Sequence, residues 1–399
     1  MNIKSLLLGS AAALVAVSGV QAADAVVVAE PEPAEYVRVC DVYGAGYFYI
    51  PGTETCLRVG GLIRQDIFGG KLLGRTDVKD YQDLDSDGEP RTHDSYSYLT
   101  RAELRFWTGQ ETELGTLSTY VSTRFDWANG GATNTGWLKY GWVQLGGLRL
   151  GKDESAFSAF SGYAGNVIQD SLIGYGGDFD TNLISYTFDA GNGFSAIISL
   201  EQGYDASNIS TSSALFDPTD SDQRPVDFGW NHTINSYVPH IVGGVKYTQG
   251  WGGANVVVGY DSNYETVAVK GRLDVNVGAN ASLWVMGAYS NHKYGRDGFD
   301  HDYDFYKNWD GKWAVYGGGT YKVNEKTSLN AQLSYDAGKT FAAAANVSYD
   351  IVPGWNVTAE VSYVNQKNWH AADAAIGTAT TAHEKGDAWG VAVRFDRAF

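Results

Sequence analysis

Beyond its first residues, the sequence lacks any apolar run long enough to cross a bilayer as a helix, which needs about 18–20 residues. Its one long apolar stretch, residues 5–17, follows Lys4 and precedes the small-residue pattern Val20-Gln21-Ala22. This arrangement is typical of a signal peptide, so we expect residues 1–22 to be removed on export. The mature chain is therefore either soluble after export or crosses a membrane as strands.

Positive charge is scarce. The chain has 29 Lys and Arg residues against 46 Asp and Glu residues, and its formal net charge is −17. Removal of Lys4 with the signal peptide makes the mature chain more acidic still. Such a surface repels nucleic acid, which we exclude as a partner. It suits a bacterial surface, where divalent cations bridge acidic loops to anionic lipid heads.

Cysteine is also scarce, since Cys40 and Cys56 are the only two. They have neither CxxC spacing nor the neighbouring ligands that a redox or metal site would need. In the oxidising compartment that the signal peptide implies, we expect them to form a structural disulfide. The loop that they close has roughly 15 residues, which is worth on the order of 3 kcal/mol in the chain-entropy description.

Catalytic motifs are missing as well. The seven histidines lie mostly in segments that we expect to be loops, and none belongs to an HExxH pair. The chain has no GxSxG elbow and no glycine loop that would cradle a phosphate. We predict that the protein is not an enzyme and uses no cofactor.

What the chain does contain is glycine and aromatic residues, with 49 Gly, 26 Tyr, 16 Phe and 12 Trp. These residues suit short strands joined by tight turns, and aromatics form the interfacial girdles of membrane barrels. Apolar and polar residues alternate with a period of two, as where Val391, Val393 and Phe395 oppose Ala392 and Arg394. The alternation predicts sixteen strands, near 57–67, 97–108, 116–127, 137–145, 148–152, 182–188, 194–202, 239–248, 253–261, 264–276, 281–290, 312–323, 327–336, 339–351, 355–364 and 387–399.

The expected connections alternate between short and long. Links such as 146–147 and 352–354 are short, whereas 68–96, 128–136, 153–181, 203–238, 291–311 and 365–386 are longer; 262–263 and 337–338 are short exceptions in the longer set. All the long loops therefore emerge at one end, as expected for short periplasmic turns opposite extracellular loops. A soluble sandwich has no reason to sort its loops in this way. Sixteen strands close a barrel wide enough for a water-filled channel.

Two stretches and the C-terminus resemble a known family. Residues 37–61, VRVCDVYGAGYFYIPGTETCLRVGG, resemble the N-terminal segment of the alphaproteobacterial porins, and residues 141–152, GWVQLGGLRLGK, resemble the fourth and fifth strands of general porins. The terminal Phe399 resembles the signature by which outer-membrane barrels are presented to their assembly machinery. Leu62 departs from the aromatic residue expected in close relatives.

The resemblance implies a general porin of the bacterial outer membrane, a homotrimer in contact with outer-membrane lipids. Small hydrophilic solutes and ions would diffuse through it passively. The fold would be all-β, a 16-stranded antiparallel transmembrane β-barrel with an inward-folded constriction loop. We therefore divide the chain into residues 1–22 (signal peptide), 23–56 (an N-terminal arm with the Cys40–Cys56 disulfide) and 57–399 (the barrel).

In general porins the loop after the fifth strand narrows the lumen, and residues 153–181 match it here. We expect its acids to face a basic wall across the constriction, where opposed charges would set a transverse field. The acids are Asp153, Glu154, Asp170, Asp178 and Asp180, and the basic wall is Arg58, Arg64, Arg101, Arg105, Arg124, Arg149 and Lys152. In the alternative interpretation several of these bases only pair with Glu103 or Asp126 on the wall. The basic wall favours anions and the acidic mouth loops favour cations. We expect cations to be preferred, because the mouth loops concentrate the permeant counter-ion.

Three further possibilities stay open. The acids Asp83, Asp85, Asp87 and Asp94 match part of a calcium loop, although the usual bidentate Glu is absent, Pro90 intrudes, and a solvated acidic loop fits better. The barrel could act mainly as an adhesin or surface-binding protein with a closed lumen. The chain could also be a soluble, secreted calcium-binding β-protein.

Overall fold

The computed structural model describes residues 38–176, 180–204, 232–292, 304–366 and 386–399. Contacts divide the chain into two compact units, residues 1–38 and 39–399, and only the second is described below. Its elements are β1 (Phe48–Tyr49), β2 (Cys56–Gly69), β3 (Arg75–Leu84), β4 (Pro90–Ser95), β5 (Ser97–Thr112), β6 (Gly115–Ala128), β7 (Gly131–Leu145), β8 (Leu148–Glu154), α1 (Ala156–Ala159), β9 (Asp180–Asp189), β10 (Phe194–Glu201), β11 (His240–Gln249), β12 (Gly252–Asp261), β13 (Thr266–Val277), β14 (Ala281–Ser290), β15 (Trp313–Lys322), β16 (Thr327–Asp336), β17 (Phe341–Val352), β18 (Trp355–Gln366) and β19 (Gly386–Ala398).

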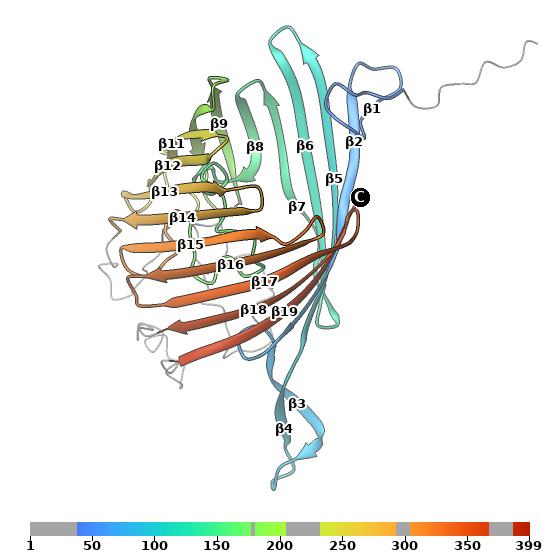
Figure 1. Cartoon of the computed structure of the whole chain (residues 1–399), viewed down its shortest axis with the longest axis vertical. Helices are drawn as coiled ribbons and strands as arrows, with labels where there is room; N and C mark the ends of the chain where they lie inside the picture. Colours follow the sequence, from blue (N-terminus) through green and yellow to red (C-terminus); the bar gives the residue numbers. More distant parts are fainter. Residues whose placement is uncertain (1–37, 177–179, 205–231, 293–303, 367–385) are drawn as a thin grey trace, which may run out of the picture. The chain divides into compact units, whose positions relative to one another are not determined.

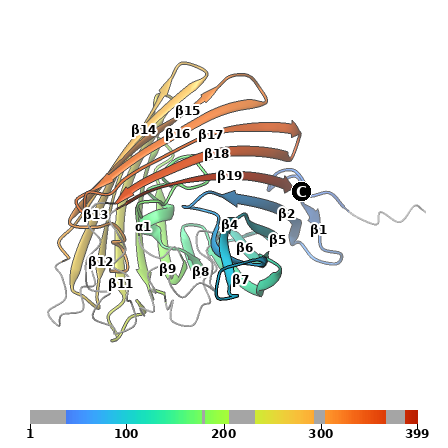
Figure 2. The same ribbon diagram turned by 90° about the horizontal axis from the view of Figure 1, so that it is seen from below.

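The strands form a closed antiparallel barrel (Figures 1 and 2). Each barrel strand pairs with the next along the chain, and the last, β19, pairs with the first, β2. The two-residue β1 adds only to β2, and β3 and β4 make a separate hairpin, so sixteen of the described strands form the wall. Every strand expected from the sequence lies in this wall, which confirms the fold class.

Two connections differ from expectation. The link expected at 128–136 is the two-residue turn Asn129-Gly130, and both residues have a positive φ, of 48° and 86°. This is the geometry of a type I′ hairpin turn, for which Asn-Gly is a preferred pair. The segment 68–96 was expected to be a loop but contains the β3–β4 hairpin, which extends beyond the wall (Figure 1).

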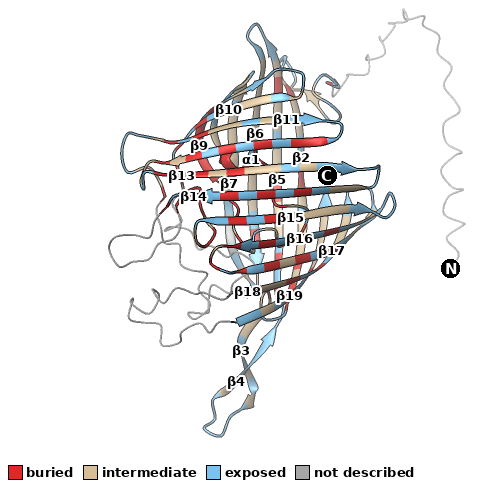
Figure 3. Ribbon diagram, turned by 60° about the vertical axis from the view of Figure 1, so that its left-hand side comes forward, coloured by how far each residue is buried: buried red, intermediate tan, exposed pale blue. Residues whose placement is uncertain are grey.

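The side chains are arranged inside out relative to a soluble sandwich. On β16, Leu333 is 57% exposed whereas its neighbour Gln332 is 3% exposed. The same alternation of exposed and buried residues runs along β14 and β17 (Figure 3). Because the exposed row is apolar and the buried row is largely polar, the outer surface suits acyl chains and the interior suits water or polar contacts. The period of two seen in the sequence therefore places its apolar row outward.

An apolar core nevertheless fills part of the interior. The segment that follows β8 turns inward, and its Phe157, Phe160 and Tyr175 pack against Val257 and Trp284 on the inner wall. Figure 2 places α1, which belongs to this segment, on the inner side of the strands. The inward-folded segment expected from the sequence is thus present, and it leans on one side of the barrel.

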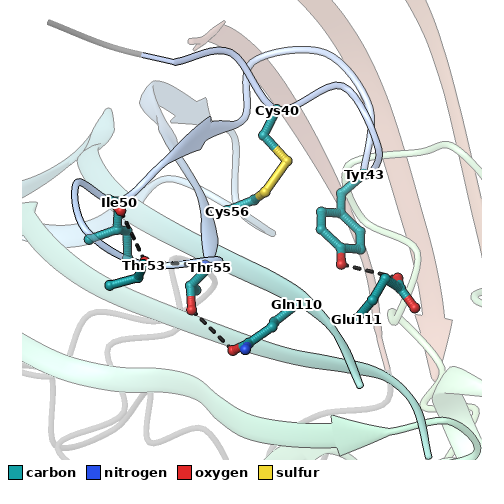
Figure 4. The surroundings of a disulfide bond; sticks show 8 residues. All are labelled: Cys40, Tyr43, Ile50, Thr53, Thr55, Cys56, Gln110 and Glu111. Atoms are coloured by element: carbon teal, nitrogen blue, oxygen red, sulfur yellow. Dashed lines mark hydrogen bonds between the residues drawn. A yellow bond between two sulfur atoms is a disulfide. The ribbon is translucent and has the colours of Figure 1, made fainter. Parts of the chain in front are cut away.

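Near the start of the described residues, the disulfide expected from the sequence is confirmed. Cys40 and Cys56 are bonded, and Tyr43, in the loop that they close, donates a hydrogen bond to Glu111 on β5 at 3.0 Å (Figure 4). The expected signal peptide, residues 1–22, lies outside the described residues. Among the residues that the structure describes, no helix is long and apolar enough to span a membrane.

Candidate functional site

The inward segment, residues 155–176, begins at a buried carboxylate on the barrel wall. Ser155 is the N-cap of α1, and its hydroxyl accepts a hydrogen bond from the amide of Phe157. Glu201 at the end of β10 accepts hydrogen bonds from the Ser155 hydroxyl at 2.7 Å and the Ala156 amide at 2.8 Å. A buried carboxylate requires such donors, so Glu201 fixes the point where the chain leaves the wall.

A second buried carboxylate holds the far side of the segment. Glu360 on β18 accepts hydrogen bonds from the amides of Ile168 and Gln169, the latter at 2.8 Å. It also accepts one from the Asn346 side chain at 2.9 Å, and Asn346 in turn donates to the carbonyl of Asn166 at 3.0 Å. The turn at 166–169 is therefore attached to β17 and β18.

Further wall side chains donate to four carbonyls of the segment, one between these two anchors and three after the second. They are Asn255 to Ser161 at 3.0 Å, Gln332 to Asp170 at 2.7 Å, Lys270 to Tyr175 at 2.8 Å, and Tyr316 to Gly174. The Lys270 ammonium is fully buried and also lies 4.6 Å from the Phe157 ring centroid. Together these contacts satisfy a backbone that has no regular secondary structure after α1, so the segment holds one position inside the barrel.

The acids expected to line a constriction are not gathered into one ring. Asp153 and Glu154 belong to the end of β8 and Asp180 to the start of β9, so only Asp170 lies on the inward segment itself; Asp178 is outside the described residues. Asp153 pairs with Arg149 at 2.5 Å, and Glu154 accepts hydrogen bonds from the hydroxyls of Tyr140 and Tyr163. The charge of Asp153 is therefore neutralised by Arg149, and that of Glu154 is stabilised by two tyrosine hydroxyls.

Asp170 is turned into the core of the segment. Its carboxylate accepts a hydrogen bond from the Tyr175 hydroxyl at 2.7 Å. Burial raises the pKa of Asp170, the nearby charge of Glu360 raises it further, and the hydrogen bond from Tyr175 acts in the opposite direction. Asp170 therefore presents little negative charge to the open lumen.

Opposite the segment, arginines form cross-strand rows on the inner face of β19, β2, β5 and β6. The residues Asp396, Arg64, Arg101 and Asp126 are successive Cα partners across these strands. Arg64 pairs with Asp396 at 2.7 Å, and Arg101 pairs with Asp126 at 2.7 Å. The two guanidinium groups thus stand side by side, with a carboxylate on each flank.

The next row centres on Glu103, which is 1% exposed as a side chain. It pairs with Arg105 at 2.6 Å and Arg124 at 2.8 Å, and these arginines are 31% and 17% exposed. The carboxylate is therefore buried beneath two guanidinium groups that reach the lumen. The alternative interpretation, in which bases pair with Glu103 or Asp126, is therefore correct for these arginines. In each pair the arginine side chain is more exposed than the carboxylate.

Two basic residues of these rows were missed by the sequence analysis. Arg394 pairs with Asp66 at 2.6 Å, and its polar position on β19 was visible in the alternation. Lys139 is buried and its ammonium contacts Asp180, which also pairs with Lys152 at 2.7 Å. Strict alternation would place Lys139 on the outer face with Val143, but the register shifts between Ser122 and Thr123 and leaves Lys139 as a bulged extra residue.

Arg58 and Arg149 are not brought together with the other arginines. Arg58 lies six positions before Arg64 on β2, or about 20 Å along an extended strand. Its guanidinium carbon is 3.9 Å from the Trp107 ring centroid, and that of Arg149 is 4.0 Å from the Trp142 ring centroid. Both lie near the end of the barrel where the turns are short.

The candidate calcium acids lie on the β3–β4 hairpin. Asp85 uses one carboxylate oxygen to accept hydrogen bonds from the amides of Asp87 and Glu89, both at 2.9 Å. Asp83 lies 3.7 Å from Arg91. No group of three His, Cys, Asp or Glu side chains within the described ranges is placed to hold a metal ion.

Comparison with known proteins places this geometry in context. The sequence profile of the porin subfamily matches residues 24–392. The chain is 46% identical to porin Omp2b of Brucella suis over 413 residues, covering 100% of both chains. It is 45% identical to porin Omp2b of Brucella neotomae over 362 residues, covering 87% of this chain and 88% of that protein.

Solved structures share the fold at low sequence identity. The outer membrane channel DcaP of Acinetobacter baumannii aligns with a TM-score of 0.59 at 14% identity, covering 88% of this chain and 99% of that one. The anion-selective porin from Comamonas acidovorans aligns with a TM-score of 0.52 at 15% identity, covering 87% and 100%. At these identities the likeness extends to the architecture alone.

Proposed function

Because the chain belongs to the porin subfamily and is a general porin of the bacterial outer membrane, we propose that solutes cross it between segment 155–176 and the arginine rows. The observation that carries the proposal is the division of the lumen. One side is filled by a segment fixed through Glu201 and Glu360, and the other side presents partly exposed guanidinium groups. Small hydrophilic solutes and ions would diffuse through the remaining space without tight binding.

The constriction has an unequal charge distribution in this proposal. Arg101, Arg105 and Arg124 reach the lumen above the buried carboxylates of Asp126 and Glu103, and Arg64 pairs with the partly exposed Asp396. The acid of the facing segment, Asp170, is hydrogen-bonded within that segment. Since the outermost charges act most strongly on a passing ion, the constriction favours anions. Lys152, Asp153, Glu154 and Asp180 contribute at the β8–β9 edge. Acidic mouth loops would oppose this preference by concentrating cations.

The outer surface supports a homotrimer. On β2 and β5 the outward side chains of Gln65 and Thr100 are hydrogen-bonded to each other at 2.7 Å, and Thr108 on β5 is hydrogen-bonded to Thr119 on β6 at 2.6 Å. Polar groups are unfavourable against acyl chains, whereas β14 and β16 present only apolar side chains at their exposed positions, such as Leu283, Val285 and Leu333. We assign the face of β2, β5 and β6 to contact between copies and the remainder of the outer surface to lipid.

The termini complete the proposal. Residues 1–22 would direct export, residues 23–56 would form the disulfide-bonded arm, and residues 57–399 would form the barrel. The Phe399 amide donates a hydrogen bond to the Gly61 carbonyl at 3.1 Å, and the Gly61 amide donates one to the Phe399 carbonyl at 3.0 Å. The terminal residue is therefore paired with β2 where the barrel closes. This position suits recognition of the last strand by the barrel assembly machinery. As a channel the protein needs no cofactor, and we assign it no catalysis.

A planar-bilayer recording in a salt gradient tests the function. Purified protein should give stepwise, long-lived conductance increments grouped in threes. Replacing Arg105 and Lys152 together by Glu should shift the reversal potential toward cations, and an unchanged value would remove both residues from the constriction. Protein that gives no conductance but binds surfaces would support the adhesin alternative, and protein that stays soluble without detergent would support the secreted calcium-binding alternative.

A further inference from the structure

A row of aromatic side chains crosses the inner wall on the short-turn side of the constriction, where Trp107 follows Arg105 by two positions on β5. Arg58, Trp107, Tyr120 and Trp142 are successive Cα partners on β2, β5, β6 and β7. The next partner in the row is Gly151 on β8, which packs so closely that an added Cβ would lie 2.7 Å from the Cα of Trp142. Since Arg58 shares the inward parity of Arg64, and Trp107 that of Glu103, the row faces the lumen.

Two rings of this row are stacked and the third is tilted. Trp107 and Tyr120 have centroids 5.3 Å apart with 24° between their planes, whereas Tyr120 and Trp142 are 5.6 Å apart at 51°. Guanidinium groups close both ends, Arg58 on Trp107 and Arg149 on Trp142. Because the faces of Trp107 and Tyr120 cover one another, we infer that the edges of these two rings point off the wall. Ring edges carry partial positive charge, so the row is electropositive toward the lumen.

Arg58 differs from the arginines of the constriction. Its guanidinium lies between the Trp107 ring, at 3.9 Å, and the Tyr47 ring, at 5.3 Å. Among the residues that the structure describes, no carboxylate lies within ion-pair distance of it and no acceptor takes a hydrogen bond from its N–H groups. Arg58 is thus held by aromatic rings, and its N–H donors are left for a ligand. That edge matches a carboxylate in two parallel hydrogen bonds.

We propose that Arg58, Trp107 and Tyr120 form a binding subsite for small aromatic carboxylates in the short-turn vestibule of the lumen. The ligand carboxylate pairs with Arg58, and its ring lies flat over the edges of Trp107 and Tyr120 in an edge-to-face contact. Arg58 and Trp107 lie on neighbouring strands, which are about 4.8 Å apart. A ligand whose carboxylate pairs with Arg58 can therefore place a single aromatic ring over Trp107. The subsite rests on the proposed open lumen and adds a weak preference among the anions that enter it.

Benzoate and acetate separate this subsite from general attraction of anions, since both carry one carboxylate. Wild-type conductance in potassium chloride first establishes that the channel is open. Potassium benzoate should then reduce the current in a saturable way, and acetate at equal concentration should reduce it much less. In Arg58→Gln the half-blocking benzoate concentration should rise at least about ten-fold, as expected for the loss of a charge-assisted pair of hydrogen bonds.

Two further variants make the test specific. Arg91→Gln removes the same charge from the exposed β3–β4 hairpin and should keep the wild-type half-blocking concentration. Arg58→Lys keeps the charge but loses the planar fork, so it should lie between wild type and Arg58→Gln. Equal block by acetate and benzoate in the wild type, or the same half-blocking concentration in Arg58→Gln and Arg91→Gln, would overturn the subsite. Absence of any channel in potassium chloride would instead refute the open lumen.

Discussion

The side chain of Glu360 accepts a hydrogen bond from the backbone amide of Gln169, 191 positions earlier in the chain, at 2.8 Å. One residue lies on the second-last strand of the barrel and the other at the turn of the inward segment. This contact attaches the inward segment to the wall.

Replacing Glu360 by Gln should loosen segment 155–176. The amide cannot accept at both positions now facing Ile168 and Gln169, so one buried N–H loses its partner at a cost of about 1–3 kcal/mol. We expect larger and noisier single-channel currents because the segment samples positions nearer the wall. Glu325→Gln removes the same charge from an exposed turn and serves as the control. Quiet, wild-type currents in Glu360→Gln would show that this anchor is dispensable.

Replacing Glu103 by Gln should make the channel more selective for anions. The carboxylate neutralises parts of the charge on Arg105 and Arg124, and its loss leaves both guanidinium groups uncompensated at the lumen. The permeability ratio of chloride to potassium should about double, measured as a reversal potential in a salt gradient. Glu113→Gln in a short turn gives the comparison for a charge removed outside the lumen. A shift of equal size in both variants would contradict a local effect.

Replacing Asp170 by Asn should stabilise the protein at neutral pH only. Burial raises the folded-state pKa of Asp170 above its ordinary value, so the contribution of the acid form is complete below about pH 4 and is lost as the pH rises through the raised pKa. Asn cannot ionise and avoids that loss. Thermal unfolding in detergent should therefore give a higher midpoint for Asp170→Asn at pH 7 and equal midpoints near pH 3. A difference that grows toward acid pH would reverse the assigned sign.

Loss of the disulfide should destabilise the arm without closing the channel. Cys40 and Cys56 are 16 positions apart, and a cross-link of that length is worth about 3 kcal/mol. In the double variant Cys40→Ser with Cys56→Ser, proteolysis should cut within 40–56 much faster than in wild type, while the barrel resists. Mass spectrometry of the fragments locates the cuts. Protection equal to that of wild type would mean that contacts such as Tyr43 with Glu111 suffice.

Placing a charge on the outer surface should separate lipid-facing positions from turns. Leu333 lies mid-strand on β16 and Leu114 lies in a short turn, and both are exposed, at 57% and 79%. Leu333→Arg should cost about 2–4 kcal/mol on folding into vesicles, whereas Leu114→Arg should cost little. Equilibrium unfolding titrations in vesicles measure both. Equal costs would indicate that Leu333 does not contact acyl chains.

Much of the fold could be predicted from the sequence because strand alternation is a local property. The pattern of Leu329, Ala331 and Leu333 against Asn330 and Gln332 fixes both strand and face without knowledge of partners. The family, the sixteen-stranded barrel, the outer-membrane location and the disulfide were confirmed. The short turn at Asn129-Gly130 was also readable from its two residues, since Asn-Gly favours positive φ, but the expected link, 128–136, was too long.

The site was only partly predictable, because it depends on departures from alternation and on distant pairing. Lys139 faces the lumen through a bulge, and a bulge is a one-residue shift of register that single-sequence periodicity does not reveal. Whether the basic and acidic residues expected from the sequence form the constriction stays a prediction.

The sequence by itself determined which residues form strands and which row of each strand is apolar, because those properties repeat every two residues along one chain. Only the tertiary structure decided which carboxylates lie beneath which arginines, and where segment 155–176 is attached. Those contacts join residues such as Gln169 and Glu360 that are far apart in sequence, and barrel closure with a defined register is what brings them within hydrogen-bond distance.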